Sequence, residues 1–220
     1  MMIELVADDG HRFDAYRAGP PGKPRGGVVV VQEIFGVNSH IRSIADAYAA
    51  EGYVAIAPAL FDRVAKHIEL GYTPADIERG RELKAASALE LAMRDLAAAT
   101  RAALPAGKVG VVGFCWGGYL AWMAAATLPG IACAVPYYGG GILDHADLVP
   151  RCPVMCHFGE SDAIIPAEGV KSLAARYPEQ QIFLYQAGHG FNCDQRGSWN
   201  ATAAKLARER TLAFLSTHIG

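Results

Sequence analysis

The chain has 220 residues, of which 52% are hydrophobic and 19% are charged, and its formal net charge is −2. Near-neutral charge without a basic stripe argues against a nucleic-acid-binding protein, and no apolar run is long enough to span a bilayer. A chain of this length buries a full α/β core and commonly forms one domain. We therefore expect a single domain over residues 1–220, with neither nucleic acid nor a membrane as a partner.

Short apolar runs and helical patterns alternate through the first half of the chain. Asp9-Gly10 separates two alternating runs and predicts an antiparallel hairpin. Residues 28–31 are an unbroken valine run, which is typical of a parallel strand buried on both faces. Ser39 precedes a helical pattern and is the expected N-cap of that helix. The predicted strands are 3–7, 12–18, 28–31 and 53–57, and the predicted helices are 39–51 and 75–104, the second broken near Gly80.

The same alternation continues through the second half. The predicted strands are 108–112, 131–138, 153–158 and 181–185, and helices are expected directly after residue 115, at 167–177 and at 200–218. Strands that alternate with helices form a mainly parallel sheet with helices on both faces. The sequence therefore predicts an α/β fold with an N-terminal antiparallel hairpin, without repeats or a domain linker.

Cys115 lies in the most informative motif, Gly-Phe-Cys-Trp-Gly-Gly at residues 113–118, between a predicted strand and a predicted helix. The G-x-S-x-G elbow of α/β-hydrolases places a serine nucleophile at such a turn, and here a thiol replaces the hydroxyl. The glycines leave room for neighbouring elements where the backbone is strained. The N-terminus of the following helix favours an anionic sulfur or oxyanion. We predict that Cys115 is a nucleophile.

Asp162 and His189 supply the two partners that an elbow nucleophile needs. In the elbow fold these partners follow the nucleophile in the order Asp or Glu, then His. Asp162 follows the predicted strand 153–158 and His189 follows the strand 181–185, so both are expected at the carboxyl edge of the sheet. Either residue alone is also compatible with an ordinary loop, but the three in this order predict a catalytic triad.

Cysteine usage indicates a reducing compartment. The five cysteines are an odd number and show no metal-ligand spacing, which is typical of a cytoplasmic protein with free thiols. Residues 1–9 have neither the basic segment nor the apolar segment of a signal peptide, which favours the same location. The cysteines are Cys115, Cys133, Cys152, Cys156 and Cys193.

Four motifs in order resemble the dienelactone hydrolase (carboxymethylenebutenolidase) family. They are Gln-Glu-Ile-Phe-Gly at 32–36, the elbow at 113–118, Gly-Glu-Ser-Asp at 159–162 and Ala-Gly-His-Gly-Phe at 187–191. The likeness runs from the hairpin to the terminal helix. It implies an α/β-hydrolase fold and a monomeric hydrolase that opens the ester bond of a small lactone, most often dienelactone to maleylacetate. It implies no metal and no organic cofactor.

The resemblance also assigns roles around Cys115. In the family, a Glu matching Glu33 contacts the resting thiol and moves when substrate binds, so that the Cys-His pair forms the thiolate. Backbone N–H groups at the positions of Ile34 and Trp116 make the oxyanion hole. His189 would then act as the base, oriented by Asp162.

Substrate-binding residues are also expected by resemblance. The family binds the carboxylate of dienelactone with two arginines, and Arg81 matches the first of them better than Arg79 does. The second family position is Cys193 here, and we expect Arg196, three residues later, to replace it. A solvated surface charge is the alternative for each arginine. Further expected pocket residues are Phe35, Tyr138 and Trp116.

Three other functions share parts of this pattern. A class I glutamine amidotransferase also has a cysteine elbow, but it has Glu two residues after the His, where this chain has Phe191. A broad carboxylesterase or thioesterase would keep the same triad and differ only in its pocket. A non-enzymatic thiol sensor is the third alternative, and the intact triad argues against it.

Overall fold

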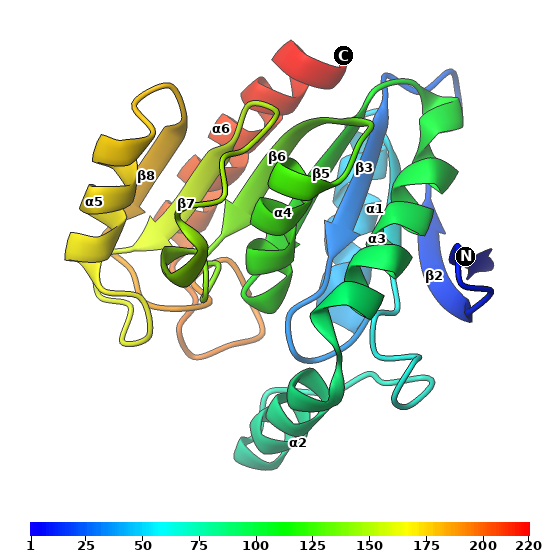
Figure 1. Cartoon of the computed structure of the whole chain (residues 1–220), viewed down its shortest axis with the longest axis horizontal. Helices are drawn as coiled ribbons and strands as arrows, with labels where there is room; N and C mark the ends of the chain where they lie inside the picture. The colour runs from blue at the N-terminus through cyan, green and yellow to red at the C-terminus, as the bar shows by residue number, and fades with distance from the viewer.

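One eight-stranded sheet runs through the computed structural model, which describes residues 1–220 (Figure 1). The strand order is β1-β2-β4-β3-β5-β6-β7-β8. The first two pairings, β1 with β2 and β2 with β4, are antiparallel, and every pairing from β4 to β8 is parallel. The predicted α/β sheet with an N-terminal hairpin is confirmed. The strands are β1 (Met2–Val6), β2 (Arg12–Ala18), β3 (Gly27–Val31), β4 (Val54–Pro58), β5 (Val109–Phe114), β6 (Ile131–Tyr137), β7 (Met155–Gly159) and β8 (Gln181–Tyr185).

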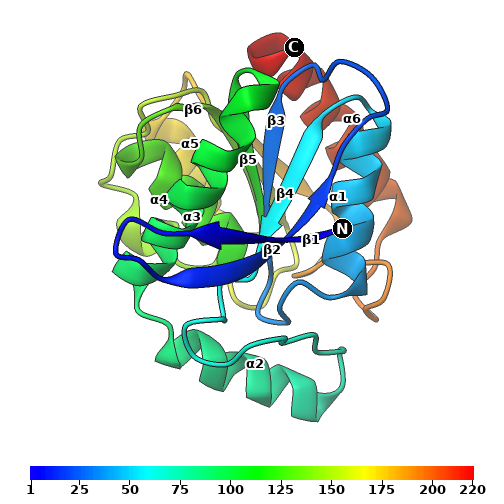
Figure 2. The same cartoon turned by 90° about the vertical axis from the view of Figure 1, so that its right-hand side faces the viewer.

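Helices cover both faces of this sheet (Figures 1 and 2). On one face α3 and α4 pack on the central strands, and on the other α1 and α6 do so. The helix α2 stands off the body at one end of the sheet (Figure 2). None of the helices combines the length and the apolar character needed to cross a membrane. The helices are α1 (Ser39–Ala50), α2 (Pro74–Ala86), α3 (Leu89–Ala103), α4 (Trp116–Thr127), α5 (Ala167–Arg176) and α6 (Ala201–Ile219).

Burial on both faces explains the valine run of β3. All five residues of the strand are buried. Val28 and Val30 belong to the core cluster that includes α1 and α6, whereas Val29 and Val31 belong to the cluster under α3 and α4. Alternate side chains of a strand point to opposite faces, so a strand covered on both sides needs apolar residues at every position.

The prediction of one long helix over residues 75–104 was wrong. Two helices occupy this range, and the break lies at Ser87, not near Gly80. The Ser87 hydroxyl donates to the carbonyl of Leu83 and its backbone turns to an extended conformation, which ends α2. Gly80 lies inside α2. A Cβ there would come within 2.3 Å of the Ile34 carbonyl oxygen, which explains why this helical position is a glycine. The glycine permits close packing of α2 on the loop after β3.

The cap of α1 also differs by one residue from the prediction. Asn38 is the N-cap, and its side-chain oxygen accepts a hydrogen bond from the Ile41 N–H at 3.2 Å, while Ser39 is the first helical residue. Both residue types are good caps. The Asn38 amide also donates to the Leu70 carbonyl, a contact from a distant loop that favours it as the cap.

The elbow at Cys115 has a backbone that side chains rarely adopt. Cys115 has φ of 54°, and its N–H donates to the Tyr137 carbonyl at 3.0 Å. A Cβ at Gly113 would lie 1.9 Å from the Gly117 carbonyl oxygen, and a Cβ at Gly117 would lie 2.4 Å from that of Val31. The turn can therefore form only because these two positions lack side chains.

We expect Gly113→Ala to lower the free energy of unfolding by at least about 2 kcal/mol, because the added methyl collides with backbone that cannot move aside. Gly22→Ala is the matched control, since a Cβ at Gly22 meets nothing within 4 Å. It should change stability by less than about 0.5 kcal/mol. Urea denaturation of the three proteins measures both effects. Equal stability of Gly113→Ala and the wild type would contradict this account of the turn.

Candidate active site

Five polar or nucleophilic residues lie in the loops or turns that follow five parallel strands. Glu33 follows β3, Cys115 follows β5, Tyr138 follows β6, Asp162 follows β7 and His189 follows β8. The carboxyl ends of parallel strands lie at one edge of a sheet, which is where open α/β sheets assemble their sites. The convergence expected from the sequence is present in the structure.

Cys115, His189 and Asp162 form a continuous hydrogen-bonded series. The Cys115 Sγ lies 3.2 Å from His189 Nε2, and His189 Nδ1 lies 2.8 Å from Asp162 Oδ2. The other carboxylate oxygen of Asp162 accepts hydrogen bonds from the N–H groups of Ile164 and Ile165 at 2.8 and 3.2 Å. Both oxygens of Asp162 are thus held, so the carboxylate orients the imidazole with Nε2 toward the sulfur.

The charges of this series stabilise one another. Burial opposes ionisation of Asp162, but hydrogen bonds from His189 and from the loop N–H groups hold the pKa of this carboxyl below its ordinary value. Burial also opposes a charged imidazole, yet the hydrogen bonds to Asp162 and Cys115 raise the pKa of His189 to about 10. The His189 imidazole is thus placed to exchange a proton with the Cys115 sulfur. This geometry can hold and regenerate a sulfur nucleophile.

Two backbone N–H groups are free near the elbow. Trp116 is the first residue of α4, so its N–H has no acceptor within the helix. The Ile34 N–H, in the loop after β3, donates to no backbone carbonyl. The Trp116 side chain stacks on Phe61 at 5.2 Å between ring centroids, which fixes this end of α4. Both expected oxyanion-hole donors are available for an acceptor.

Glu33 is 1% exposed and pairs with Arg196. Its Oε1 accepts from Arg196 Nη1 at 3.1 Å, and its Oε2 is buried without a partner. The contact between Glu33 and the resting thiol that the family resemblance implies is not made here, because the sulfur faces His189. The structure therefore brings Arg196 to the site through the carboxylate of Glu33.

Aromatic rings hold the Arg196 guanidinium in place. It lies 5.6 Å from the ring centroid of Phe35 and 6.0 Å from that of Tyr72. The two rings pack edge to face at 4.6 Å. Cation–π contacts of this kind fix a guanidinium without adding charge. Tyr72 was missed by the sequence analysis, because it lies in the loop between β4 and α2 and belongs to no motif.

Tyr138 lies beside the catalytic histidine candidate. It is fully buried, has a φ of 36°, and its ring packs edge to face on His189 at 5.2 Å. Its hydroxyl is buried without a hydrogen-bond partner. Burial first, and then the nearby Glu33, raise the pKa of Tyr138 well above its ordinary value, so the hydroxyl stays a neutral donor. Tyr138 thus contacts His189, and its place in a substrate pocket stays a prediction.

Arg81 is not brought into contact with these residues. Its side chain is 67% exposed on α2 and lies 3.7 Å from Glu78. Its neighbour Arg79 pairs with Glu82 in the same way. Exposed pairs of this kind on a helix contribute little to stability. Of the two arginines expected to bind a carboxylate, only Arg196 contacts the site in this structure.

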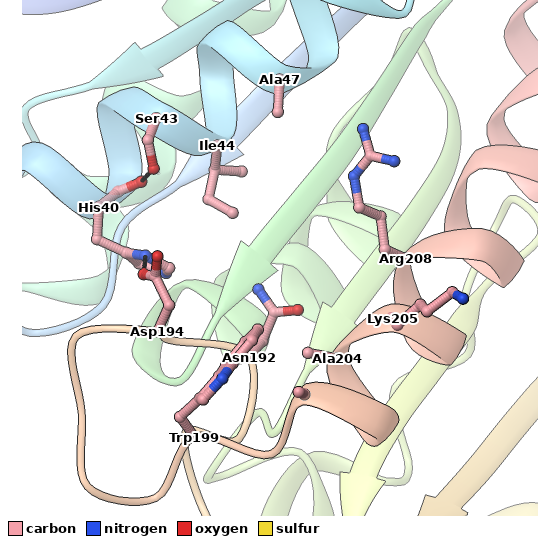
Figure 3. A pocket seen from close by; sticks show the side chains of 11 residues that line it. His40, Ser43, Ile44, Ala47, Asn192, Asp194, Trp199, Ala204, Lys205 and Arg208 are labelled. Atoms are coloured by element: carbon pink, nitrogen blue, oxygen red, sulfur yellow. Dashed lines mark hydrogen bonds and ion pairs between the residues drawn. The ribbon is translucent and has the colours of Figure 1, made fainter.

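A separate cavity of about 380 Å³ lies away from the triad, between α1 and the start of α6 (Figure 3). His40 and Ile44 line it from α1, and Asn192, Asp194 and Trp199 line it from the loop before α6. None of the triad residues contributes to its wall. The site of the proposed chemistry and this cavity are therefore distinct.

Comparison with known proteins identifies similar chains along nearly the whole length. A model of the dienelactone hydrolase family matches residues 13–219. A carboxymethylenebutenolidase of Pseudomonas putida is 37% identical over 228 residues, which cover 97% of this chain and 95% of that protein. A Synechocystis sp. protein named "putative carboxymethylenebutenolidase" is 40% identical over 212 residues, covering 87% of this chain and 86% of its own. The crystal structure of a "putative dienelactone hydrolase" from Klebsiella pneumoniae has a TM-score of 0.86 at 31% identity, over 99% of this chain and 100% of its own.

The His189–Asp162 pair predicts a pH-dependent stability difference between the wild type and Asp162→Asn. The ordinary pKa values are 3.8 for Asp and 6.5 for His, and the folded state lowers the first and raises the second to about 10. The stabilisation is therefore complete between these ordinary values. It falls as pH drops below 3.8 and as pH rises from 6.5 through about 10.

Urea denaturation at about pH 5.5 and about pH 10 measures this difference. The destabilisation caused by Asp162→Asn should be larger at the lower pH. Asp147→Asn, at an exposed residue without a hydrogen-bonded partner, is the control and should show no such trend. A destabilisation by Asp162→Asn that is the same at both pH values would contradict the charged pair.

Proposed function

The chain belongs to the dienelactone hydrolase family, and from that membership we propose that Cys115 opens the ester bond of a small lactone. The protein is a carboxylic ester hydrolase. The observation that best supports the finer proposal is the continuous series of Cys115, His189 and Asp162 at the carboxyl edge of the sheet. We propose dienelactone, which would be converted to maleylacetate, as the substrate.

The proposed reaction has two stages. The Cys115 thiolate attacks the ester carbonyl carbon, and the Ile34 and Trp116 N–H groups hydrogen-bond the resulting oxyanion. Collapse of this intermediate breaks the C–O bond of the ring, and His189 gives its proton to the leaving oxygen. Water, deprotonated by His189, then attacks the thioester and releases the carboxylic acid and the free thiol. No step calls for a metal or an organic cofactor.

The Glu33–Arg196 pair supports an anionic substrate. Arg196 is partly exposed and already binds one carboxylate, that of Glu33, at 3.1 Å. A carboxylate on the substrate would compete for the same guanidinium, since arginine binds carboxylates through several N–H groups. We propose that this competition releases Glu33 and places the substrate carboxylate on Arg196.

A broad esterase is the second candidate, and the position of Arg81 favours it. Two arginines were expected to bind the substrate carboxylate, but Arg81 pairs with Glu78 at the surface. A pocket with one arginine discriminates less between charged and neutral esters. Steady-state kinetics on cis- and trans-dienelactone beside p-nitrophenyl acetate distinguish the two functions, because only a lactonase prefers the charged lactones.

We expect Cys115→Ala to abolish hydrolysis of every ester and Cys115→Ser to lower kcat by orders of magnitude, because the serine hydroxyl has a much higher pKa than a thiol. Iodoacetamide should inactivate the wild type by alkylating Cys115 first. Burial raises the pKa of each of the other four thiols, which lowers their reactivity. Mass spectrometry of the modified peptides measures the order of labelling.

Cys152→Ala is the matched control for that experiment, since Cys152 is a partly exposed thiol that plays no part in the proposed reaction. It should retain activity and its sensitivity to iodoacetamide. Full activity of Cys115→Ala would require a different nucleophile.

The preference for a charged substrate is tested by Arg196→Gln and Arg81→Gln. We expect Arg196→Gln to lower the ratio of kcat/KM for dienelactone to that for p-nitrophenyl acetate by about 10- to 150-fold, the value of a charge-assisted hydrogen bond of about 1.5–3 kcal/mol. The ratio cancels any general loss of activity. The same ratio measured for Arg81→Gln tests whether Arg81 is the expected second arginine. All proteins are compared at one ionic strength, since salt screens exposed charges. Equal losses on both esters with Arg196→Gln would show that Arg196 supports the fold and does not bind substrate.

A further inference from the structure

We propose that His40, Cys193 and Asp194 form a binding site for a divalent transition-metal ion of the zinc type, separate from the catalytic triad. One potential ligand atom from each residue lies within 4.8 Å of the other two. His40, near the start of α1, is 2% exposed, and Cys193, in the loop after β8, is fully buried. Residues far apart in the sequence thus bring nitrogen, sulfur and oxygen donors together at one point.

The donor set fits zinc and similar ions. Thiolate, imidazole and carboxylate are its usual protein ligands, and three of them with a water molecule complete a tetrahedral site. Bonds of about 2.0–2.3 Å place the ligand atoms of such a site about 3.5 Å apart, so a modest movement closes this cluster. Asp194 has the freedom to move, because its side chain is 62% exposed.

The contact between His40 and Asp194 is the second observation that supports the site. The Nδ1 atom of His40 lies 3.1 Å from Asp194 Oδ1, which is close to the separation of two ligand atoms on one tetrahedral zinc ion. Nδ1 and Oδ1 can therefore bind the same ion. The Nε2 atom of His40, buried without a hydrogen-bond partner, lies on the other side of the ring and would carry the proton when Nδ1 binds an ion.

The surroundings provide an entry path. Figure 3 shows His40 and Asp194 meeting at one end of the cavity between α1 and α6, while Arg208 and Lys205 lie toward its other end. The cavity, of about 380 Å³, has room for the water molecules that accompany an entering ion. The two cations are therefore placed away from His40 and Asp194.

The catalytic triad contains the same three residue types but cannot bind an ion in this way. There, Cys115 and Asp162 contact opposite nitrogens of the His189 ring, so the three groups lie in series. In the second cluster the donor atoms converge on one another. The two clusters have the same residue types, and the arrangement of their side chains makes one suited to proton transfer and the other to binding a metal ion.

A bound ion would fasten the loop after β8 to the first turn of α1. The same loop carries Arg196, which reaches Glu33, and a hydrogen-bond contact of 3.2 Å between Ser39 and Gln195 already links the two segments. Ester hydrolysis as proposed above does not require the ion. Its expected effect is to stabilise the folded state, because binding to the folded state alone raises stability.

The test uses Cys115→Ser as the parent protein, so that the reactive thiol of the triad cannot bind the probe. Co²⁺ is added to the chelator-treated parent and followed by absorbance, and Zn²⁺ is then used to displace it. We expect one equivalent of Co²⁺ to produce a thiolate-to-cobalt charge-transfer band and to raise Tm. Adding Cys193→Ser should remove the band, and adding His40→Gln or Asp194→Asn should weaken binding at least about tenfold.

Cys152→Ser in the same parent is the matched control and should leave the band and the affinity unchanged. Circular dichroism establishes that each variant is folded, and if the Cys193 variant is not, the His40 and Asp194 variants decide. A missing band in the parent would overturn the site. So would a band that survives Cys193→Ser, or an affinity that His40→Gln and Asp194→Asn leave unchanged. None of these results depends on the activity of Cys115, so failure of this proposal is distinct from failure of the proposed hydrolysis.

Discussion

The backbone at Cys115 is the constraint on which the site depends. Its φ is positive and α4 starts at the next residue, so the free N–H of Trp116 directly follows the proposed nucleophile. Such a conformation persists only where the surroundings enforce it. Here the enforcing contacts are the approach of Gly113 to Gly117 and of Gly117 to the end of β3, together with the hydrogen bond from Cys115 to β6. The loop that carries Glu33 and Ile34 is thereby packed against the elbow.

Two buried ion pairs share the space around the sulfur. His189 and Asp162 form one, and Arg196 and Glu33 form the other. Each buried carboxylate has its own cation, which offsets the large cost of removing charge from water. The balance is incomplete at Glu33, whose second oxygen has no partner, and at Tyr138, whose hydroxyl has none. These unsatisfied polar groups mark the place where a polar substrate or water would gain hydrogen bonds.

The loop after β8 contributes residues both to the site around Cys115 and to the proposed metal site at His40. It begins with His189, passes through Cys193 and Asp194, and reaches Arg196 before α6 starts. Successive turns, in which the Cys193 N–H donates to Gly190 and the Arg196 N–H donates to Cys193, set the spacing of these side chains. One short loop thus presents a base to the sulfur, a cation to Glu33 and a thiol to His40. An ion bound by His40 and Cys193, as proposed above, would therefore restrain the same loop that carries Arg196.

Local sequence patterns were sufficient to predict the strands, the elbow and the three residues of the proposed triad. These features are local: a valine run specifies a strand buried on both faces, and the spacing of glycines around Cys115 specifies a sharp turn. The position of Asp162 and His189 after strands then follows from the geometry of a parallel sheet. The resemblance to a known family located Glu33 and Arg196, although it did not pair them.

Contacts between side chains that are distant in the sequence could not be predicted in this way, because they depend on how the whole chain packs. Arg196 and Glu33 are 163 residues apart in the chain, and His40 and Asp194 are 154 apart, so no periodicity or motif connects them. Tyr72 joins Phe35 for the same reason, through packing of a loop with no pattern of its own. The break at Ser87 and the close approach of Gly80 to Ile34 likewise depend on how α2 rests on the loop after β3. Local propensity specifies elements, whereas contacts between elements are set by the packing of the whole chain.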